Sequence, residues 1–315
     1  GSLYFGASWS VDAGDDLNDR CVFVSTEGEI AVYSGLVSSE FTLDGLYDMA
    51  RPISKDTMKA GGDLLIMTEV GLVPLSEALQ RDAGALSLGA VSRPIEPYWR
   101  SQAARLTQDW DIQKWTAENL MVISQPGDTT KGGTALVGNL QTGAFSRFTG
   151  MSTQCLGLFD DTVFFGSPSG AVYRLQNSGS DAGMPYVAAY VGQFESLGLP
   201  GIEKSIKNVR PTLSAATEIQ PHVSVLVDYD ETLSAAPNAV ESSATDGWDI
   251  SIWDVSVWDA AAAEGFSPED SLWRAVGKTG YAIAHEVQMN FGGLAAPSVE
   301  LVDIHATFTV GALVT

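Results

Sequence analysis

The first half of the sequence repeats one pattern, in which two short hydrophobic segments are joined by a glycine-centred turn. The turns centre on Gly28, Gly71, Gly143 and Gly170, within residues 21–33, 64–75, 136–148 and 162–175. Apolar segments on either side of a turn that requires glycine predict a β-hairpin. Hairpins that recur at intervals of roughly 30 to 70 residues are typical of β-propeller blades, because one blade must stack on the next to bury its faces. We therefore predict an all-β protein that opens with β-propeller-like hairpin repeats over residues 1–178.

Residues 76–115 form the one stretch of this first region with helical character. Ser76 is suited to cap a short helix, whereas Pro94 and Pro97 interrupt anything longer. We expect a partly helical connection within a blade. It also carries a group of aromatic residues, namely Tyr98, Trp99, Trp110 and Trp115.

A different set of strands follows the turn-rich residues 177–183. Strands are expected at 186–194, 206–213, 222–228, 282–289 and 299–309. Residues 222–228 and 304–310 largely alternate apolar with polar side chains, the pattern of a sheet with one covered and one exposed face. We predict a β-sandwich or barrel-like domain over residues 179–315, with a Trp-Asp-rich insertion at about 230–274.

The composition of the chain indicates which classes of partner it can bind. The chain has 39 acidic against 17 basic residues and a formal net charge of −22, which disfavours tight binding of double-stranded DNA through the overall field. Such acidity is still compatible with a duct through which DNA slides. The low charged fraction of 18% and the eight tryptophans predict that partners cover some apolar surface, so we expect self-association. No stretch approaches the about 18 apolar residues of a membrane span, and none is expected.

Two features with possible binding chemistry have simpler interpretations. Cys21 and Cys155 lie in apolar strand segments and are expected to be buried free thiols. Asp12, Asp15, Asp16 and Asp19 crowd one short segment, as calcium ligands do, but the spacing does not match an EF-hand. A solvated loop is the preferred interpretation of Asp12–Asp19, with calcium binding left open.

Three Trp-Asp pairs follow one another at a five-residue step, beginning at Trp248, Trp253 and Trp258. Five is neither the strand nor the helix period, so the indoles do not share one strand face. The spacing also does not fit a WD40 repeat, whose Gly-His partner is missing. We expect these residues to pack against the domain core or a neighbouring subunit, and a sugar-binding platform is the alternative.

The scarce basic residues cluster once, as Lys204, Lys207 and Arg210. A three-residue interval places them on both faces of a strand, so they do not form a clean nucleic-acid stripe. We expect them to pair with the acidic surface of a neighbouring copy.

Catalytic motifs are not found in the sequence. His222, His285 and His305 lie in strand segments without metal-ligand spacing, and the common nucleophile, phosphate-loop and dinucleotide motifs are missing. We predict a protein that is not an enzyme and needs no cofactor or metal.

Several segments, taken in order, resemble the tail hub or nozzle proteins of short-tailed double-stranded DNA phages, also described as packaged-DNA stabilisation proteins. These segments are residues 29–35, 61–76, 142–150, 175–183, the Trp-Asp run and 277–281. The resemblance implies a β-propeller on further β domains, assembled as a ring that is commonly hexameric. Such a ring belongs to the virion, extends the portal channel, retains packaged DNA and conducts it during ejection. Its expected partners are portal and adaptor proteins and tail fibres or spikes.

The chain departs from this resemblance in one respect, because it shows only about four blades, fewer than a closed propeller requires. Two other functions are also compatible with the sequence. One is a carbohydrate-binding or carbohydrate-cleaving propeller, such as a receptor-binding or depolymerase protein, with residues 98–115 and 248–258 lining the sugar site. The other is a cellular propeller scaffold that binds proteins.

Overall fold

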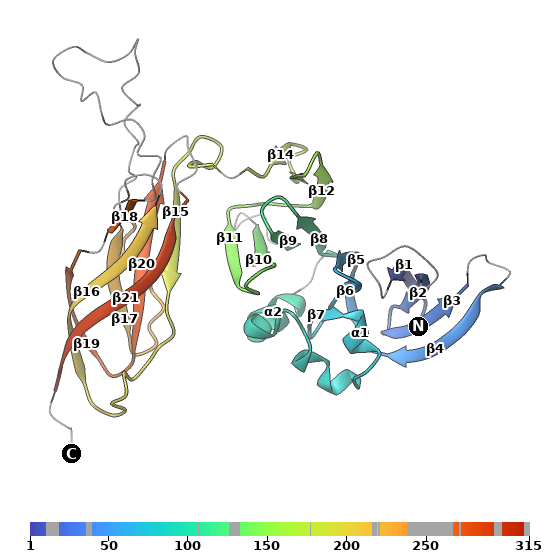
Figure 1. The fold of residues 1–315 in the computed structure, drawn as a ribbon, viewed down its shortest axis with the longest axis horizontal. Helices are drawn as coiled ribbons and strands as arrows, with labels where there is room; N and C mark the ends of the chain where they lie inside the picture. The colour runs from blue at the N-terminus through green and yellow to red at the C-terminus, as the bar shows by residue number, and fades with distance from the viewer. Residues whose placement is uncertain are drawn as a thin grey trace, which may run out of the picture. The chain divides into compact units, whose positions relative to one another are not determined.

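The computed structural model shows an all-β protein made of two compact units, residues 1–176 and 177–315 (Figure 1). It describes residues 1–10, 19–35, 40–105, 108–125, 133–176, 178–215, 219, 221–237, 267–270, 272–292 and 298–311. The predicted all-β class is confirmed. The division between the units falls at the start of the turn-rich residues 177–183.

The first unit consists of four antiparallel sheets, each built from strands that follow one another in sequence. Sheet 1 contains β1 (Leu3–Ser10), β2 (Asp19–Ser25), β3 (Glu29–Ser34) and β4 (Thr42–Asp48). Sheet 2 contains β5 (Pro52–Ala60), β6 (Asp63–Thr68) and β7 (Gly71–Pro74). Sheet 3 contains β8 (Asp111–Trp115), β9 (Leu120–Gln125), β10 (Thr134–Asn139) and β11 (Phe145–Thr149). Sheet 4 contains β12 (Cys155–Phe159), β13 (Thr162–Gly166) and β14 (Val172–Arg174). All four predicted hairpins are confirmed, as β2–β3, β6–β7, β10–β11 and β13–β14.

Alternation along the strands explains how these sheets stack. In β6, Leu64 and Ile66 point into a core shared with sheet 1, whereas Leu65 and Met67 point into a core shared with sheet 3. In β9, Ile123 belongs to the same core as sheet 2, and its neighbour Val122 packs towards sheet 4. Successive side chains of a strand point to opposite faces, so continuous apolar strands allow sheets 2 and 3 to be buried on both sides. The result is a series of blade-like sheets in sequence order.

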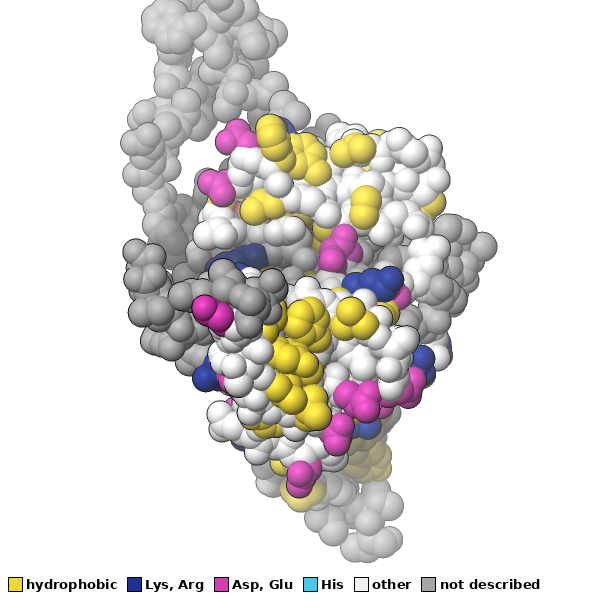
Figure 2. All heavy atoms as spheres, turned by 90° about the vertical axis from the view of Figure 1, so that its right-hand side faces the viewer, with side chains coloured by type: hydrophobic (Ala, Val, Ile, Leu, Met, Phe, Trp, Pro, Cys, Tyr) yellow, Lys and Arg dark blue, Asp and Glu magenta, His cyan; other side chains and the backbone are white. Residues whose placement is uncertain are grey.

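Sheets 1 and 4 end this series, and each packs on the others through only one face. Figure 2 views the molecule from the side on which β3 and β4 lie in Figure 1, and hydrophobic side chains are exposed there, most densely near the middle of the view. The large apolar residues Leu43 and Leu46 of β4 are 45% and 70% exposed. The outer face of sheet 1 therefore presents apolar side chains to solvent.

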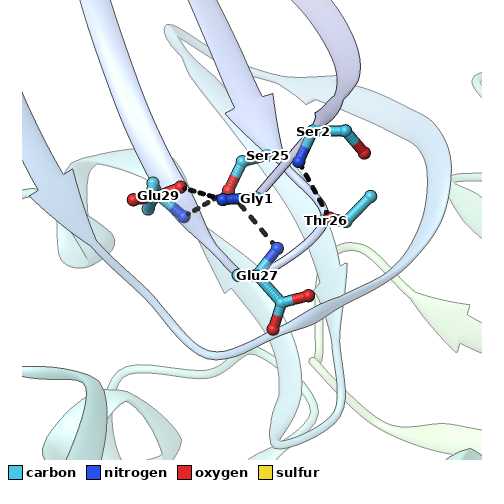
Figure 3. Close-up of polar contacts among 6 residues, drawn as sticks. All are labelled: Gly1, Ser2, Ser25, Thr26, Glu27 and Glu29. Carbon is cyan, nitrogen blue, oxygen red and sulfur yellow. Dashed lines mark hydrogen bonds and ion pairs between the residues drawn. The ribbon is translucent and has the colours of Figure 1, made fainter.

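The β2–β3 turn shows why glycine is needed in the repeated pattern. Gly28 has φ of 96°, and a Cβ at this position would collide with the carbonyl oxygen of Met49. The hydroxyl of Ser25 accepts hydrogen bonds from the amides of Glu27 (3.3 Å) and Glu29 (3.0 Å), and the amino group of Gly1 donates to the carboxylate of Glu29 at 2.8 Å (Figure 3). Local hydrogen bonds and one backbone conformation thus fix this turn.

Short helices connect sheets 2 and 3. They are α1 (Leu75–Ala78), the 3₁₀ helices η2 (Ala83–Leu88) and η3 (Arg93–Ile95), and α2 (Glu96–Ala103). The end of the predicted connection, residues 111–115, forms strand β8 instead. The expected cap is also wrong, because Ser76 lies inside α1, where its amide and hydroxyl both donate to the carboxylate of Asp63. The free amide at the start of this helix is therefore hydrogen-bonded by Asp63 of the neighbouring strand β6 and not by a capping residue next to the helix.

The second unit is a sandwich of two antiparallel sheets. One contains β15 (Tyr186–Val191), β20 (Ile283–Phe291) and β17 (His222–Val227). The other contains β16 (Lys204–Ala215), β18 (Ser267–Asp270), β19 (Arg274–Gly280) and β21 (Glu300–Val310). Ile206 and Val209 of one sheet meet Val223, Val225 and Ile283 of the other in a common core. The two sheets do not close into a barrel over the described residues, and β18 occupies the end of the predicted insertion.

Candidate functional site

The first strands of the four blade-like sheets lie next to one another, β1 beside β5, β5 beside β8 and β8 beside β12 (Figure 1). Polar side chains gather along this edge. We call Tyr4, Lys55, Asp56, Asp109 and Asp111 the inner-edge cluster. It consists of two contacting groups, Tyr4 with Lys55 and Asp109, and Asp56 with Asp111, which meet at the adjacent positions of Lys55 and Asp56 in β5, and we take it as the candidate site.

A bulge in β5 brings part of this cluster into place. β5 pairs with β6 at Pro52–Thr68 and again from Thr57–Ile66, so β5 carries extra residues between these pairs. The bulge is held by Ser54, whose buried hydroxyl donates to the carbonyl of Trp110 (2.5 Å) and accepts from the amide of Asp56 (3.0 Å). Bulges of this kind redirect side chains. Here Lys55 and Asp56 leave the sheet and reach towards β1 and β8.

Asp56 and Asp111 form a hydrogen-bonded pair of carboxyl groups. Two carboxylates repel each other, so such a bond requires a proton on one of them. Burial of Asp111, together with its hydrogen bond to Asp56, raises the pKa of Asp111 to about 7, against the opposing effect of the Leu156 amide. That amide donates to Asp111 Oδ2 at 2.5 Å. The pair therefore exchanges a proton near neutral pH while it links sheets 2, 3 and 4.

Tyr4 completes the cluster on the side of sheet 1. Its hydroxyl donates to Asp109 Oδ2 at 3.0 Å, and the Lys55 ammonium lies 5.5 Å from the centre of its ring. Burial and, second, the bond to Asp109 raise the pKa of Tyr4 to about 12, so its hydroxyl stays protonated. Lys59 adds a bond from its ammonium to the hydroxyl of Ser8 at 3.0 Å. The contact of Lys55 with Tyr4 and the bond of Lys59 to Ser8 both join sheet 2 to sheet 1.

This cluster was not predicted from the sequence, because its members are separated by up to about a hundred residues and belong to different hairpins. The only local signal is the polar run from Ser54 to Thr57 within an otherwise apolar strand. The chemistry available is proton exchange by a carboxyl pair. Within the described residues, the structure contains no group of three or more His, Cys, Asp or Glu side chains arranged to hold a metal ion.

Lys204, Lys207 and Arg210 do not form one surface. Lys204 is fully buried, and its ammonium donates to the carbonyls of Ile202 (2.7 Å) and Tyr281 (2.9 Å), so our expectation of a contact with another copy is wrong for this residue. Lys207 is exposed and donates to Ser205 Oγ at 3.1 Å. The guanidinium of Arg210 lies 5.0 Å from the ring centre of Trp273.

The remaining candidate residues from the sequence are the tryptophans of the Trp-Asp pairs, the aspartates of residues 12–19 and the two cysteines. Trp248, Trp253 and Trp258 lie outside the described residues, as do Asp12, Asp15 and Asp16, while Asp19 begins β2. Cys21 is half-buried, but Cys155 is exposed, so the expected burial is wrong for Cys155. Its partner across the strands is Gly166, and both lie on the outer face of sheet 4, which no other sheet of the first unit covers.

The three histidines differ in their burial and in their contacts. His285 lies in β20 with its Nε2 buried and unbonded, and burial lowers its pKa, so the native protein holds this imidazole neutral. His305 Nε2 lies 3.0 Å from Asp303 Oδ2 on the exposed strand β21. His222 is half-buried at the start of β17.

Polar side chains on β20 hold the first residues of the predicted Trp-Asp-rich insertion. The fully buried carboxylate of Glu286 accepts from the amide and the hydroxyl of Ser234, both at 2.8 Å. Gln288 donates to the carbonyl of Ser234 (2.9 Å) and Asn290 to that of Pro237 (2.8 Å). Residues 231–237 are thereby held along β20 at the base of the insertion.

Comparison with known proteins does not identify the chain: no protein-family model matches it, and no curated protein does. No helix in the described part of the chain has the length and hydrophobicity needed to cross a membrane. The interpretation of function therefore depends on the fold, the clusters above and the resemblance in the sequence.

Proposed function

We propose that this chain is a structural, ring-forming component of a virion tail, the hub or nozzle of a short-tailed phage, without enzymatic activity. The observation that carries the proposal is the series of two-sided apolar sheets joined to a β-sandwich. Such a series favours further stacking over a self-contained domain. In the proposed role the ring extends the portal channel, retains packaged DNA and conducts it during ejection.

The charge of the chain supports this role. A net charge of −22 repels a polyanion, so DNA would pass along such a wall without sticking to it. In this proposal the inner-edge cluster has a structural role, because its bonds hold the four sheets together. Contacts with portal or adaptor proteins and with fibres or spikes belong to the proposal through the resemblance alone.

The glycan-binding alternative receives less support from the described residues. Trp99 and Trp110 are buried in the core between sheets 2 and 3, with ring centres 5.0 Å apart, and Trp99 Nε1 donates to the carbonyl of Thr68 at 2.8 Å. Residues 98–115 therefore do not form an exposed aromatic platform. The alternative depends on Trp248 to Trp258, which lie outside the described residues.

The mass of the purified chain in solution tests the proposal, by light scattering or native mass spectrometry with negative-stain images of the same sample. A closed ring with a central opening is expected. A chain that stays monomeric at high concentration, and binds a glycan that Trp253→Ala abolishes, would replace the proposal with the glycan-binding function.

A further inference from the structure

The series of sheets in the first unit has an apolar outer face at each end. On sheet 1, cross-strand pairing places Phe23, Ala31 and Leu46 in one row and Tyr33 and Leu43 in the next. These residues alternate with Val22, Val24, Ile30 and Val32, which are buried in the core with sheet 2. The rings of Phe23 and Tyr33 contact edge to face with centres 5.8 Å apart. We call this face the sheet 1 outer face.

Sheet 4 repeats the arrangement at the other end. Its inner side chains, Val163 and Phe165, face sheet 3, so the alternate positions Phe159, Phe164, Val172 and Arg174 form the sheet 4 outer face. Phe159 and Val172 are 75% and 74% exposed. The rings of Phe159 and Phe164 lie 6.5 Å apart, edge to face. Large apolar side chains at this exposure are unusual for a solvent-facing sheet and mark interaction sites.

We propose that the sheet 4 outer face of one copy packs on the sheet 1 outer face of the next copy, head to tail. This inference deepens the proposed function, since it rests on self-assembly of the chain and identifies the two surfaces that produce it. Two different surfaces that fit each other give a heterologous contact, which closes into a ring when the rotation between copies allows it.

The internal packing indicates that a second copy is the occupant. Sheets 1, 2, 3 and 4 already stack through apolar faces of this kind, and the new contact would add one more sheet to the same series.

The charges on the two faces are complementary. Asp48 is an exposed carboxylate at one end of the sheet 1 outer face, beside its cross-strand partner Glu29, whose own carboxylate already bonds the Gly1 amino group. Arg174 stands on the sheet 4 outer face, directly opposite Phe164 across the strands. The two carboxylates of Asp160 and Asp161 lie in the β12–β13 turn, beyond that face. The Arg174 guanidinium of one copy would thus face the Asp48 carboxylate of the next.

Single and mixed variants test the proposal. Leu46→Asp disables the sheet 1 outer face, and Phe159→Asp disables the sheet 4 outer face. Each alone is expected to weaken self-association by about 30-fold or more, as for a central interface residue. An equimolar mixture of the two variants retains one intact face of each kind and is expected to form a one-to-one dimer that does not grow further. Leu88→Asp changes an exposed leucine of η2 outside both faces, 53% exposed in the native chain, and serves as the matched control that still assembles.

The assay is sedimentation velocity with native mass spectrometry, after circular dichroism has shown that each variant is folded. If either variant fails to fold, Leu43→Asp or Val172→Asp replaces it on the same face. Assembly of the wild type that neither variant weakens overturns the head-to-tail contact and leaves the ring proposal standing. Loss of assembly in Leu46→Asp alone indicates a symmetric contact through sheet 1 and also overturns it. A wild type that is monomeric at every concentration overturns this inference together with the self-assembly in the proposed function.

Discussion

Replacement of Asp111 by asparagine tests the shared proton of the inner-edge cluster. Asparagine has nearly the shape of a protonated aspartic acid. Its carbonyl oxygen can accept from the Leu156 amide, and its NH₂ group can donate to Asp56, which reproduces the native bonds to these two residues. The variant therefore keeps the geometry and removes only the ionisation.

The sign of the effect follows from the raised pKa. Burial and Asp56 move the pKa of Asp111 from 3.8 to about 7, so between these values the native state binds a proton that the unfolded state has released. The free energy of unfolding of the wild type then falls as the pH rises through this interval. From about pH 5 to about pH 7, two units at 1.36 kcal/mol each set an upper limit of about 3 kcal/mol. Because Asp111 is only half-buried and Asp56 is exposed, solvent screening reduces this to about 1–2 kcal/mol.

Urea unfolding followed by tryptophan fluorescence measures the effect, since Trp99 and Trp110 report on the core between sheets 2 and 3. Relative to the wild type, Asp111→Asn is expected to gain about 1–2 kcal/mol when the pH is raised from about 5 to about 8. Asp82→Asn, a change at an exposed aspartate that makes no side-chain cap hydrogen bond to η2, is the matched control and should show no such gain. A gain that is the same at both pH values, or a loss of stability at the higher pH, would refute the shared proton.

Three further predictions concern both units. Trp99→Phe removes the bond to Thr68 and leaves a gap beside Trp110, so it should cost about 2–3 kcal/mol in urea unfolding. Glu286→Ala leaves the donors of Ser234 without an acceptor and should cost about 3 kcal/mol, with faster proteolysis at residues 231–237, whereas Glu286→Gln should be milder. Because burial lowers the pKa of His285 from 6.5, the unfolded state binds a proton below that pH that the native state does not, and the second unit should lose stability on acidification. His285→Leu should flatten this pH dependence in thermal unfolding, and an unchanged slope would contradict the assignment.

The hairpins were predictable because their determinants are local. The turn at Gly28 needs positive φ and room beside Met49, and both requirements act on a single residue between two apolar segments. The alternation in residues 222–228 likewise predicted a strand, which is β17, with Val223 and Val225 in the sandwich core. The exposed face expected for it is wrong, because Ser224 and Leu226 are buried as well. Periodicity therefore predicted the existence of these strands.

The polar sites were not predictable, because each depends on residues distant in sequence. Lys204 has the charge of a surface residue, but β16 directs it inward, where the carbonyls of Ile202 and Tyr281 hold its ammonium. Asp111 looks like any exposed aspartate until the bulge in β5 brings Asp56 against it. Local sequence propensity predicts that a segment forms a strand. Which residues its side chains contact depends on how the sheets stack, and the sequence pattern does not show this.

The order of the four sheets along the chain bears on how the first unit is made. Every core in this unit joins sheets that are consecutive in the sequence, as Ile66 of sheet 2 joins sheet 1 and Val122 of sheet 3 joins sheet 4. A ribosome releases residues in that same order, so each hairpin finds its packing partner already synthesised. Loop-closure costs stay small when contacts are this close in sequence. The first unit can thus fold progressively from its N-terminal sheet during translation, each finished sheet serving as the template for the one that follows.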